Sequence, residues 1–379
     1  MDTDPVVHWS ENGETRAACW RSQGGVSPPK RILIGRDDMK ADVAYRLACE
    51  GTAVLWRGDF QNARQMLSAL DRRIKRKPRK QTTFAETSPA QTFHLYRMAQ
   101  AQRARTLGML LLPFEADHNI LLRRAPDLRQ PCLEAFGPAD GPYLASLRDL
   151  LGAIGAHEWR KKGVEIPALG DRIYPHYGVF SPVRGEYVEL LAQAPLPSLE
   201  LAFDIGTGTG VLAAILARRG LKKVVATDLD PGALTCARDN IARLGLADRV
   251  DIVQADLFPA GQAPLVVCNP PWIPARPSSS IEQAVYDPGS RMLRGFLQRL
   301  GTHLESGGEG WLILSDLAEH LGLRTREELL TAFEEGGLKI VGRIDARPLH
   351  RKALDPTDPL HKARSMEVTS LWRLTGSET

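Results

Sequence analysis

The chain has 379 residues, 43% of them hydrophobic and 25% charged, with a net charge of +4, which is ordinary for a globular protein of about two domains. No run of 18 apolar residues occurs and the N-terminus is polar, which argues against a membrane protein and a signal peptide, so we expect a cytoplasmic protein. Five widely spaced cysteines predict neither a disulfide framework nor a zinc site, and no metal site is expected.

Positive charge is concentrated in the first 150 residues, which carry 23 Lys and Arg against 17 Asp and Glu. Residues 1–36 favour short strands, whereas apolar side chains at helical spacing favour one helix that begins at Asp37 and a second over residues 59–77. The second of these helices leads into RRIKRKPRK at residues 72–80. Like charges this dense repel one another unless phosphates or acidic partners neutralise them. We expect this basic segment to contact RNA or the ribosome, with a solvated linker as the alternative.

The sequence predicts a domain boundary in the middle of the chain. Residues 108–113 and 120–124 favour a strand pair, residues 131–142 a linker, and residues 143–162 a helix. We therefore expect an N-terminal substrate-recruitment domain, mixed but mainly helical, over residues 1–162. A second domain is expected over residues 163–379.

The most informative stretch is LELAFDIGTGTG at residues 199–210. Its apolar run predicts a buried strand, and apolar residues at helical spacing follow the glycines, so the pattern is strand, loop, helix. Gly206, Gly208 and Gly210 allow a ligand to approach main-chain N–H groups at a helix N-terminus, which suits a nucleotide-like ligand. Asp204 would repel a pyrophosphate but suits a cationic amino-acid group. Since no GKS or GKT follows, a Walker-type phosphate loop is excluded.

This pattern resembles the first motif of the class I S-adenosylmethionine-dependent methyltransferases. The resemblance implies S-adenosylmethionine as the cofactor, with Asp204 and the three glycines among its ligands. It also implies an α/β fold with a seven-stranded, Rossmann-like sheet that is mostly parallel and has a reversed last strand.

Two further strands end in acidic residues that extend the predicted cofactor site. Asp228 lies 24 residues after the aspartate of the first motif, close to the spacing at which a carboxylate contacts a ribose. In the resembled family, a residue at the position of Asp256 binds the adenine amine and the backbone of the next residue, here Leu257, completes the contact. Phe180 and Pro182 lie in a loop that resembles the segment closing over the methionine end of the cofactor; an ordinary loop is the alternative.

A fourth predicted strand ends in NPPW, Asn269 to Trp272. Pro270 and Pro271 cannot donate to a sheet and fix a rigid, extended turn. A planar –NH₂ group is a poor nucleophile because its lone pair is delocalised. Accepting its two N–H bonds on the Asn269 side-chain oxygen and the Pro270 carbonyl would favour turning the lone pair toward the methyl group. Trp272 offers a face on which an amide or a base can stack.

This motif resembles that of methyltransferases acting on glutamine amides or adenine amines, and the chain is most similar to the HemK group of protein-glutamine methyltransferases over residues 163–373. AVYDPGSRMLRGFL at residues 284–297 contributes to the similarity. Two features depart from that group: SPVRGEY replaces an Arg-Pro-Glu-Thr pattern, and Trp272 stands where tyrosine is usual. The resemblance implies methylation of a glutamine in a translation-related protein. The alternatives are an adenine in RNA or DNA, or a non-catalytic binding module that retains the fold.

Overall fold

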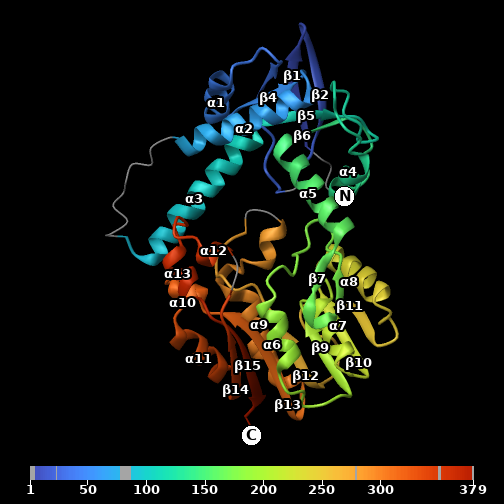
Figure 1. The fold of residues 1–379 in the computed structure, drawn as a ribbon, viewed down its shortest axis with the longest axis vertical. Helices are drawn as coiled ribbons and strands as arrows, with labels where there is room; N and C mark the ends of the chain where they lie inside the picture. The colour runs from blue at the N-terminus through green and yellow to red at the C-terminus, as the bar shows by residue number, and fades with distance from the viewer. Residues whose placement is uncertain (1–4, 23, 77–86, 278–279, 349–350, 378–379) are drawn as a thin grey trace. The chain divides into compact units, whose positions relative to one another are not determined.

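The computed structural model describes residues 5–22, 24–76, 87–277, 280–348 and 351–377. The chain divides into two compact units (Figure 1), unit 1 with residues 1–87 and 94–158 and unit 2 with residues 88–93 and 159–379. The predicted linker at residues 131–142 is therefore wrong, because it lies inside unit 1. None of the helices in the described part of the chain combines the length and apolar character that a membrane span requires.

Unit 1 is built on a six-stranded mixed sheet in the order β1-β2-β6-β5-β4-β3. Its strands are β1 (Val6–Glu11), β2 (Glu14–Trp20), β3 (Arg31–Gly35), β4 (Thr52–Trp56), β5 (Leu110–Phe114) and β6 (Tyr143–Ser146). Its helices are α1 (Ala41–Cys49), α2 (Phe60–Arg76) and α4 (Arg129–Phe136), while α3 (Pro89–Gly108) and α5 (Leu147–Lys162) contribute residues to both units. Two apolar clusters lie on opposite faces of this sheet: helices α1, α2, α4 and α5 contribute to one, whereas every buried residue of the other lies on a strand.

Unit 1 contains more sheet than the sequence predicts. The expected pairing of residues 108–113 with residues 120–124 is wrong, because β5 pairs with β4 in parallel and with β6 in antiparallel orientation. Residues 120–124 form no strand. The helix predicted over residues 143–162 begins only at Leu147, after the four buried residues of β6. Short apolar runs like these have no periodicity that separates a buried strand from a buried helix turn.

Unit 2 contains a seven-stranded sheet in the order β11-β10-β9-β12-β13-β15-β14. The first five strands of this order are parallel, and β15 is antiparallel to both β13 and β14, which confirms the predicted sheet. The strands are β9 (Leu201–Ile205), β10 (Lys223–Asp228), β11 (Val250–Gln254), β12 (Ala263–Cys268), β13 (Leu304–Ser315), β14 (Leu338–Ala346) and β15 (Thr369–Gly376). A separate hairpin consists of β7 (Val164–Ile166) and β8 (Asp171–Ile173).

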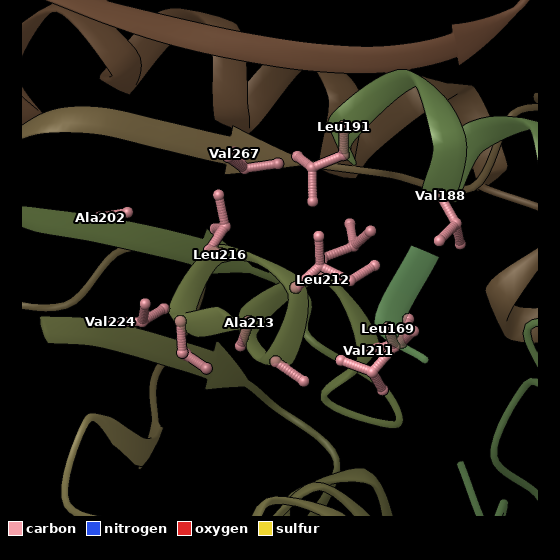
Figure 2. Packing of buried hydrophobic residues seen from close by; sticks show 14 of the residues in the cluster. Leu169, Val188, Leu191, Ala202, Val211, Leu212, Ala213, Leu216, Val224 and Val267 are labelled. Carbon is pink, nitrogen blue, oxygen red and sulfur yellow. The ribbon is translucent and has the colours of Figure 1, made fainter. Parts of the chain in front are cut away.

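Alternate residues of the unit 2 strands pack into two clusters on opposite faces of the sheet. Ala202 and Val267 join the cluster that contains α6 and α7, whereas Phe203 and Val266 join the cluster that contains α9 and α11. Figure 2 shows the apolar side chains of α7 packed between the strands and α6. The helices of unit 2 are α6 (Glu186–Gln193), α7 (Val211–Arg218), α8 (Pro231–Arg243), α9 (Arg291–His303), α10 (Leu317–His320), α11 (Arg326–Glu335), α12 (Arg351–Leu354) and α13 (His361–Met366).

The strand order places β9 where the direction of the chain's progress across the sheet reverses. From β9 the chain moves outward through β10 to β11, and then returns to the other side of β9 with β12. In open α/β sheets, ligands bind at such a reversal, outside the carboxyl ends of the strands. The loops that follow β9, β10 and β12 therefore form the edge where a ligand site is expected.

Candidate active site

The loop between β9 and α7 adopts a conformation that only glycine accepts easily. Gly206, Gly208 and Gly210 have φ angles of 73°, 57° and 81°, all in the left-handed region. A Cβ on Gly210 would lie 3.3 Å from the Ala237 Cα, so α8 packs directly against the loop. A Cβ on Gly208 would meet no atom of the described residues within 4 Å. The middle of the loop thus presents bare backbone to open space.

The end of β10 holds this loop in place. The Thr227 carbonyl accepts hydrogen bonds from the N–H groups of Gly206 and Thr207, at 2.9 and 2.8 Å. Asp228 Oδ2 accepts from the Gly208 N–H at 3.0 Å, and its Oδ1 accepts from the Asp230 N–H at 3.0 Å. Because each carboxylate oxygen can accept two hydrogen bonds, Asp228 keeps the capacity to bind ribose hydroxyls. The role of Asp228 as ribose ligand stays a prediction.

Asp204 is fully buried beneath the loop. Its Oδ2 accepts from the Thr207 Oγ1 at 2.6 Å and from the Ala213 N–H at 3.1 Å, while Oδ1 has no hydrogen-bond partner among the described residues. Burial raises the pKa of Asp204 to about 6. An unpartnered, buried carboxylate oxygen is the environment that an ammonium group would complete. The role of Asp204 and the loop as ligands of the cationic end of S-adenosylmethionine stays a prediction, and the unpartnered oxygen is chemically suited to it.

The raised pKa of Asp204 predicts a pH dependence of cofactor binding. A cation binds the ionised carboxylate, which in the folded protein forms only as the pH rises through about 6. We expect the cofactor Kd to be flat above pH 7 and to rise up to about tenfold per pH unit below pH 6. Calorimetric titration between pH 5 and 8 measures this. The variant Asp204→Asn should bind more weakly at pH 7.5 and lose this slope; an unchanged slope would assign it to another group.

The residues predicted to contact adenine lie at the same edge of the sheet. Leu257 has a φ of 71°, and its carbonyl accepts a hydrogen bond from the Thr227 Oγ1 at 2.5 Å, which ties the end of β11 to the end of β10. Asp256 is exposed, and its carbonyl accepts from Arg299. Phe180 is half-buried and Pro182 is buried, in the segment between β8 and α6. The cofactor contacts of these four residues remain predictions.

Asn240 was not anticipated as part of this site. It is buried on α8, where its Oδ1 accepts from the Tyr174 N–H at 2.8 Å and its Nδ2 donates to the Thr209 carbonyl at 3.0 Å. It thereby joins the segment that precedes α6 to the glycine loop. The only signal in the sequence is an asparagine inside a helix, a position that disfavours it unless its amide is bonded.

The NPPW segment lies directly after β12, the strand adjacent to β9. Asn269 is half-buried and Pro270 is buried. The indole Nε1–H of Trp272 donates to the Asn269 Oδ1 at 2.8 Å. Since an indole can only donate, this bond fixes which end of the Asn269 amide is the oxygen. The oxygen retains capacity for one further N–H.

A charged group covers one face of Trp272. The Arg184 guanidinium carbon lies 4.7 Å from the centre of the Trp272 ring, and the Tyr187 ring stands edge-on to it at 6.5 Å between centres. Arg184 in turn forms ion pairs with Glu186 and with Glu367, which is 183 residues away in the sequence. The Trp272 ring, which also packs against both apolar clusters of unit 2, is thus held between charged and apolar neighbours. The sequence gives no sign of this arrangement.

The glycine loop after the first strand of the sheet, the acidic strand ends and the reversed last strand define a class of enzyme. The chain is a class I S-adenosylmethionine-dependent methyltransferase. Residues 188–298 match the family model described as ribosomal protein L11 methyltransferase (PrmA). The matched stretch includes the glycine loop, the ends of β10 and β11, and NPPW.

The known relatives are named for different methyl acceptors. The tRNA1(Val) (adenine(37)-N6)-methyltransferase of Shewanella amazonensis is 29% identical over 181 residues, which cover 42% of this chain and 75% of the relative. The release factor glutamine methyltransferase of Cereibacter sphaeroides is 32% identical over 191 residues, which cover 48% of this chain and 65% of the relative. A putative protein N5-glutamine methyltransferase of Methanocaldococcus jannaschii is 26% identical over 162 residues, which cover 41% of this chain and 80% of the relative. Each match spans less than half of this chain.

Proposed function

We propose that this chain methylates a planar amino nitrogen, with the side-chain amide of a glutamine in a translation-related protein as the leading acceptor. The observation that carries the proposal is the Asn269 oxygen, oriented by the Trp272 indole N–H on the strand end next to the glycine loop. An oxygen in this orientation can accept an N–H from an amino group, whereas a carbon nucleophile has no N–H to donate. S-adenosylmethionine supplies the electrophilic methyl group.

In this proposal the chain binds the two reactants and orients the acceptor. The Asp204 carboxylate and the backbone of the glycine loop bind the methionine part of the cofactor, and Asp228 binds its ribose. Asn269 Oδ1 and the Pro270 carbonyl accept the two N–H bonds of the acceptor amine. Acceptors held rigidly in this way stabilise the charge that develops on the nitrogen as its lone pair engages.

The glutamine acceptor is favoured by the similarity to the release factor glutamine methyltransferase and to the archaeal N5-glutamine relative. Adenine in RNA is the second candidate, and the tRNA adenine relative and the basic segment at residues 72–80 favour it. Both acceptors present the same planar –NH₂ group to Asn269. A cytoplasmic location is part of the proposal, because both belong to translation.

Isotope-labelled methyl transfer into cell extract tests the proposal and separates the two acceptors. The chain is incubated with labelled S-adenosylmethionine and extract that has been treated with RNase, with protease, or left untreated. We expect the label to survive RNase and to disappear with protease, with N5-methylglutamine in the hydrolysed protein. Label that disappears with RNase would assign adenine in RNA instead. Label on carbon or oxygen would overturn the amino-methyltransferase assignment.

The basic segment provides a separate prediction. Arg73 is paired with Asp42 and Lys75 with Asp71, while Lys77, Arg79 and Lys80 lie outside the described residues. Replacing Lys75, Arg76, Lys77, Arg79 and Lys80 by serine should weaken RNA or ribosome binding and flatten its salt dependence. The slope of log K against log salt becomes shallower by about 0.9 for each phosphate that the variant no longer neutralises. Filter binding from 50 to 200 mM salt measures it.

The control for the basic segment replaces two exposed lysines of unit 2, Lys222 and Lys223, by serine. Lys222 pairs with Glu200 and Lys223 with Asp251, next to the amino-terminal ends of β9, β10 and β11, which point away from the glycine loop. Their replacement should leave the slope unchanged. If the slope and affinity of the five-serine variant match those of the parent, the basic segment is a linker.

A further inference from the structure

A buried charge cluster lies behind the NPPW segment and has no role in the function proposed so far. Its centre is Glu367, whose side chain is fully buried just before β15. Glu367 Oε1 accepts from the Arg184 Nη2 at 3.0 Å and from the Ser315 Oγ, at the end of β13, at 2.6 Å. The Arg184 Nε donates to Glu186 Oε1 at 2.6 Å, in the first turn of α6. The cluster thus joins three segments that are distant in the sequence.

The charge cluster ends on the ring of Trp272. With two carboxylates binding its N–H groups, the Arg184 guanidinium is fixed in position 4.7 Å above the ring centre, a favourable cation–π arrangement. The Tyr187 edge approaches the same ring. The Trp272 ring is therefore restrained in position, and so is the N–H with which it holds the Asn269 oxygen.

The restraint on the Trp272 ring determines which end of the Asn269 amide faces the acceptor. If the Asn269 amide rotated by half a turn, its NH₂ would face the acceptor's N–H, donor against donor. The Trp272 N–H bond opposes that rotation only while the ring stays in place. A displacement of about 1 Å at a reacting centre lowers rates by roughly a hundredfold, so a loosely held ring would reduce turnover.

We infer that Arg184 is a positioning residue of the methyl-transfer site: bound by Glu186 and Glu367, it holds the Trp272 ring, whose indole N–H orients the Asn269 oxygen. The inference rests on the proposed function, since it assigns Asn269 the task of accepting the amino N–H. It also gives a reason for tryptophan in the NPPW segment, because the indole N–H supplies the bond that orients the amide.

Unit 2 provides a matched control for Arg184. The Arg343 guanidinium carbon lies 4.5 Å from the centre of the Trp372 ring, and its Nε donates to Asp345 Oδ1 at 2.6 Å. These residues belong to β14 and β15, and β13 separates β15 from β12. Arg343→Met thus removes the same two kinds of interaction away from the NPPW segment.

The first experiment compares Arg184→Met, Arg184→Lys and Arg343→Met with the parent. The measurements are the initial rate of labelled-methyl transfer into cell extract at saturating cofactor, the cofactor Kd and the melting temperature. We expect Arg184→Met to lower the rate by about ten- to a hundredfold with the cofactor Kd unchanged. Arg184→Lys should recover part of the rate, and Arg343→Met should retain it. Equal rate losses in the two methionine variants would overturn the inference.

Arg184→Met leaves the Glu367 carboxylate buried without its guanidinium, which can prevent folding. The double variant Arg184→Met/Glu367→Gln avoids this, because the glutamine is neutral and still presents an acceptor oxygen to Ser315. The same rate loss is expected of the double variant. A folded double variant with the parent's rate would overturn the inference.

A double-mutant cycle separates positioning from general destabilisation. Trp272→Phe keeps a ring under Arg184 but removes the N–H that binds Asn269. If Arg184 acts through this bond, Arg184→Met should cause no further loss in the Trp272→Phe background. Rate losses that multiply would contradict the inference while leaving the proposed function intact. Near-parent turnover of Asn269→Ala would instead contradict the proposed function itself, so the two failures are distinguishable.

Discussion

Replacement of Asn269 by alanine is expected to lower methyl transfer by about 10² to 10³-fold, equivalent to about 2.7–4 kcal/mol, while the cofactor still binds. The missing acceptor oxygen is needed most in the transition state, when the nitrogen lone pair engages, so turnover should fall more than affinity. Calorimetry gives the cofactor Kd, and labelled-methyl transfer gives the rate. The Trp272 N–H that loses its partner is in a half-buried residue, so water can replace the bond.

Asn269→Asp serves as the sharper comparison with the alanine variant. Aspartate keeps an oxygen that can accept from both the Trp272 N–H and the acceptor, but it adds a negative charge beside the cationic cofactor. We expect its cofactor affinity to change and its rate to lie between those of the parent and the alanine variant. A near-parent rate in the alanine variant would show that Asn269 has no role in methyl transfer.

Replacement of Asp228 by alanine is expected to weaken cofactor binding by more than about a hundredfold. The variant cannot form two charge-assisted hydrogen bonds to the ribose, each worth about 1.5–3 kcal/mol, and 1.4 kcal/mol corresponds to about a factor of ten. The Gly208 N–H also loses its carboxylate partner, so the glycine loop loosens in the same variant. Calorimetric titration with S-adenosylmethionine measures the change in Kd.

Asp230, two residues along the chain, supplies the control for this measurement. Its side chain caps α8 by accepting from the Gly232 N–H at 2.9 Å. Asp230→Ala should lower the free energy of unfolding by about 1 kcal/mol, the usual effect of losing an N-cap, and leave the cofactor Kd unchanged. An equal loss of affinity in both variants would show that Asp228 acts on the fold of the loop and makes no contact with ribose.

Local patterns were sufficient for the methyltransferase sheet. The strand before Gly206 and the strand that ends at Asp228 are continuous apolar runs bounded by turn residues. This pattern is typical of strands that are buried on both faces. The resemblance implied a mostly parallel sheet with a reversed last strand, and β15 is antiparallel to β13 as expected. The acidic residues at the strand ends were locatable because the carboxyl ends of parallel strands share one edge of a sheet.

Unit 1 shows where local patterns were insufficient. β4 is five residues long and entirely buried, and β6 has only four residues, so neither has a visible period. β5 pairs with β4 and with β6, which begins about 30 residues further along the chain, and not with the nearer apolar run at residues 120–124. Sheet pairing depends on which faces can be buried together, and that is a property of the assembled unit.

The sequence by itself determined the residue types of the site and their order along the chain: the glycine loop, the aspartates at the strand ends and NPPW. Only the tertiary structure decided what surrounds them. It buried one oxygen of Asp204 without a described partner, and it brought Arg184 and Glu367, 183 residues apart, together behind Trp272. The physical reason is that a motif records short-range spacing along one chain segment. Burial, pKa and contacts between distant side chains exist only after the sheet has assembled and its layers have packed.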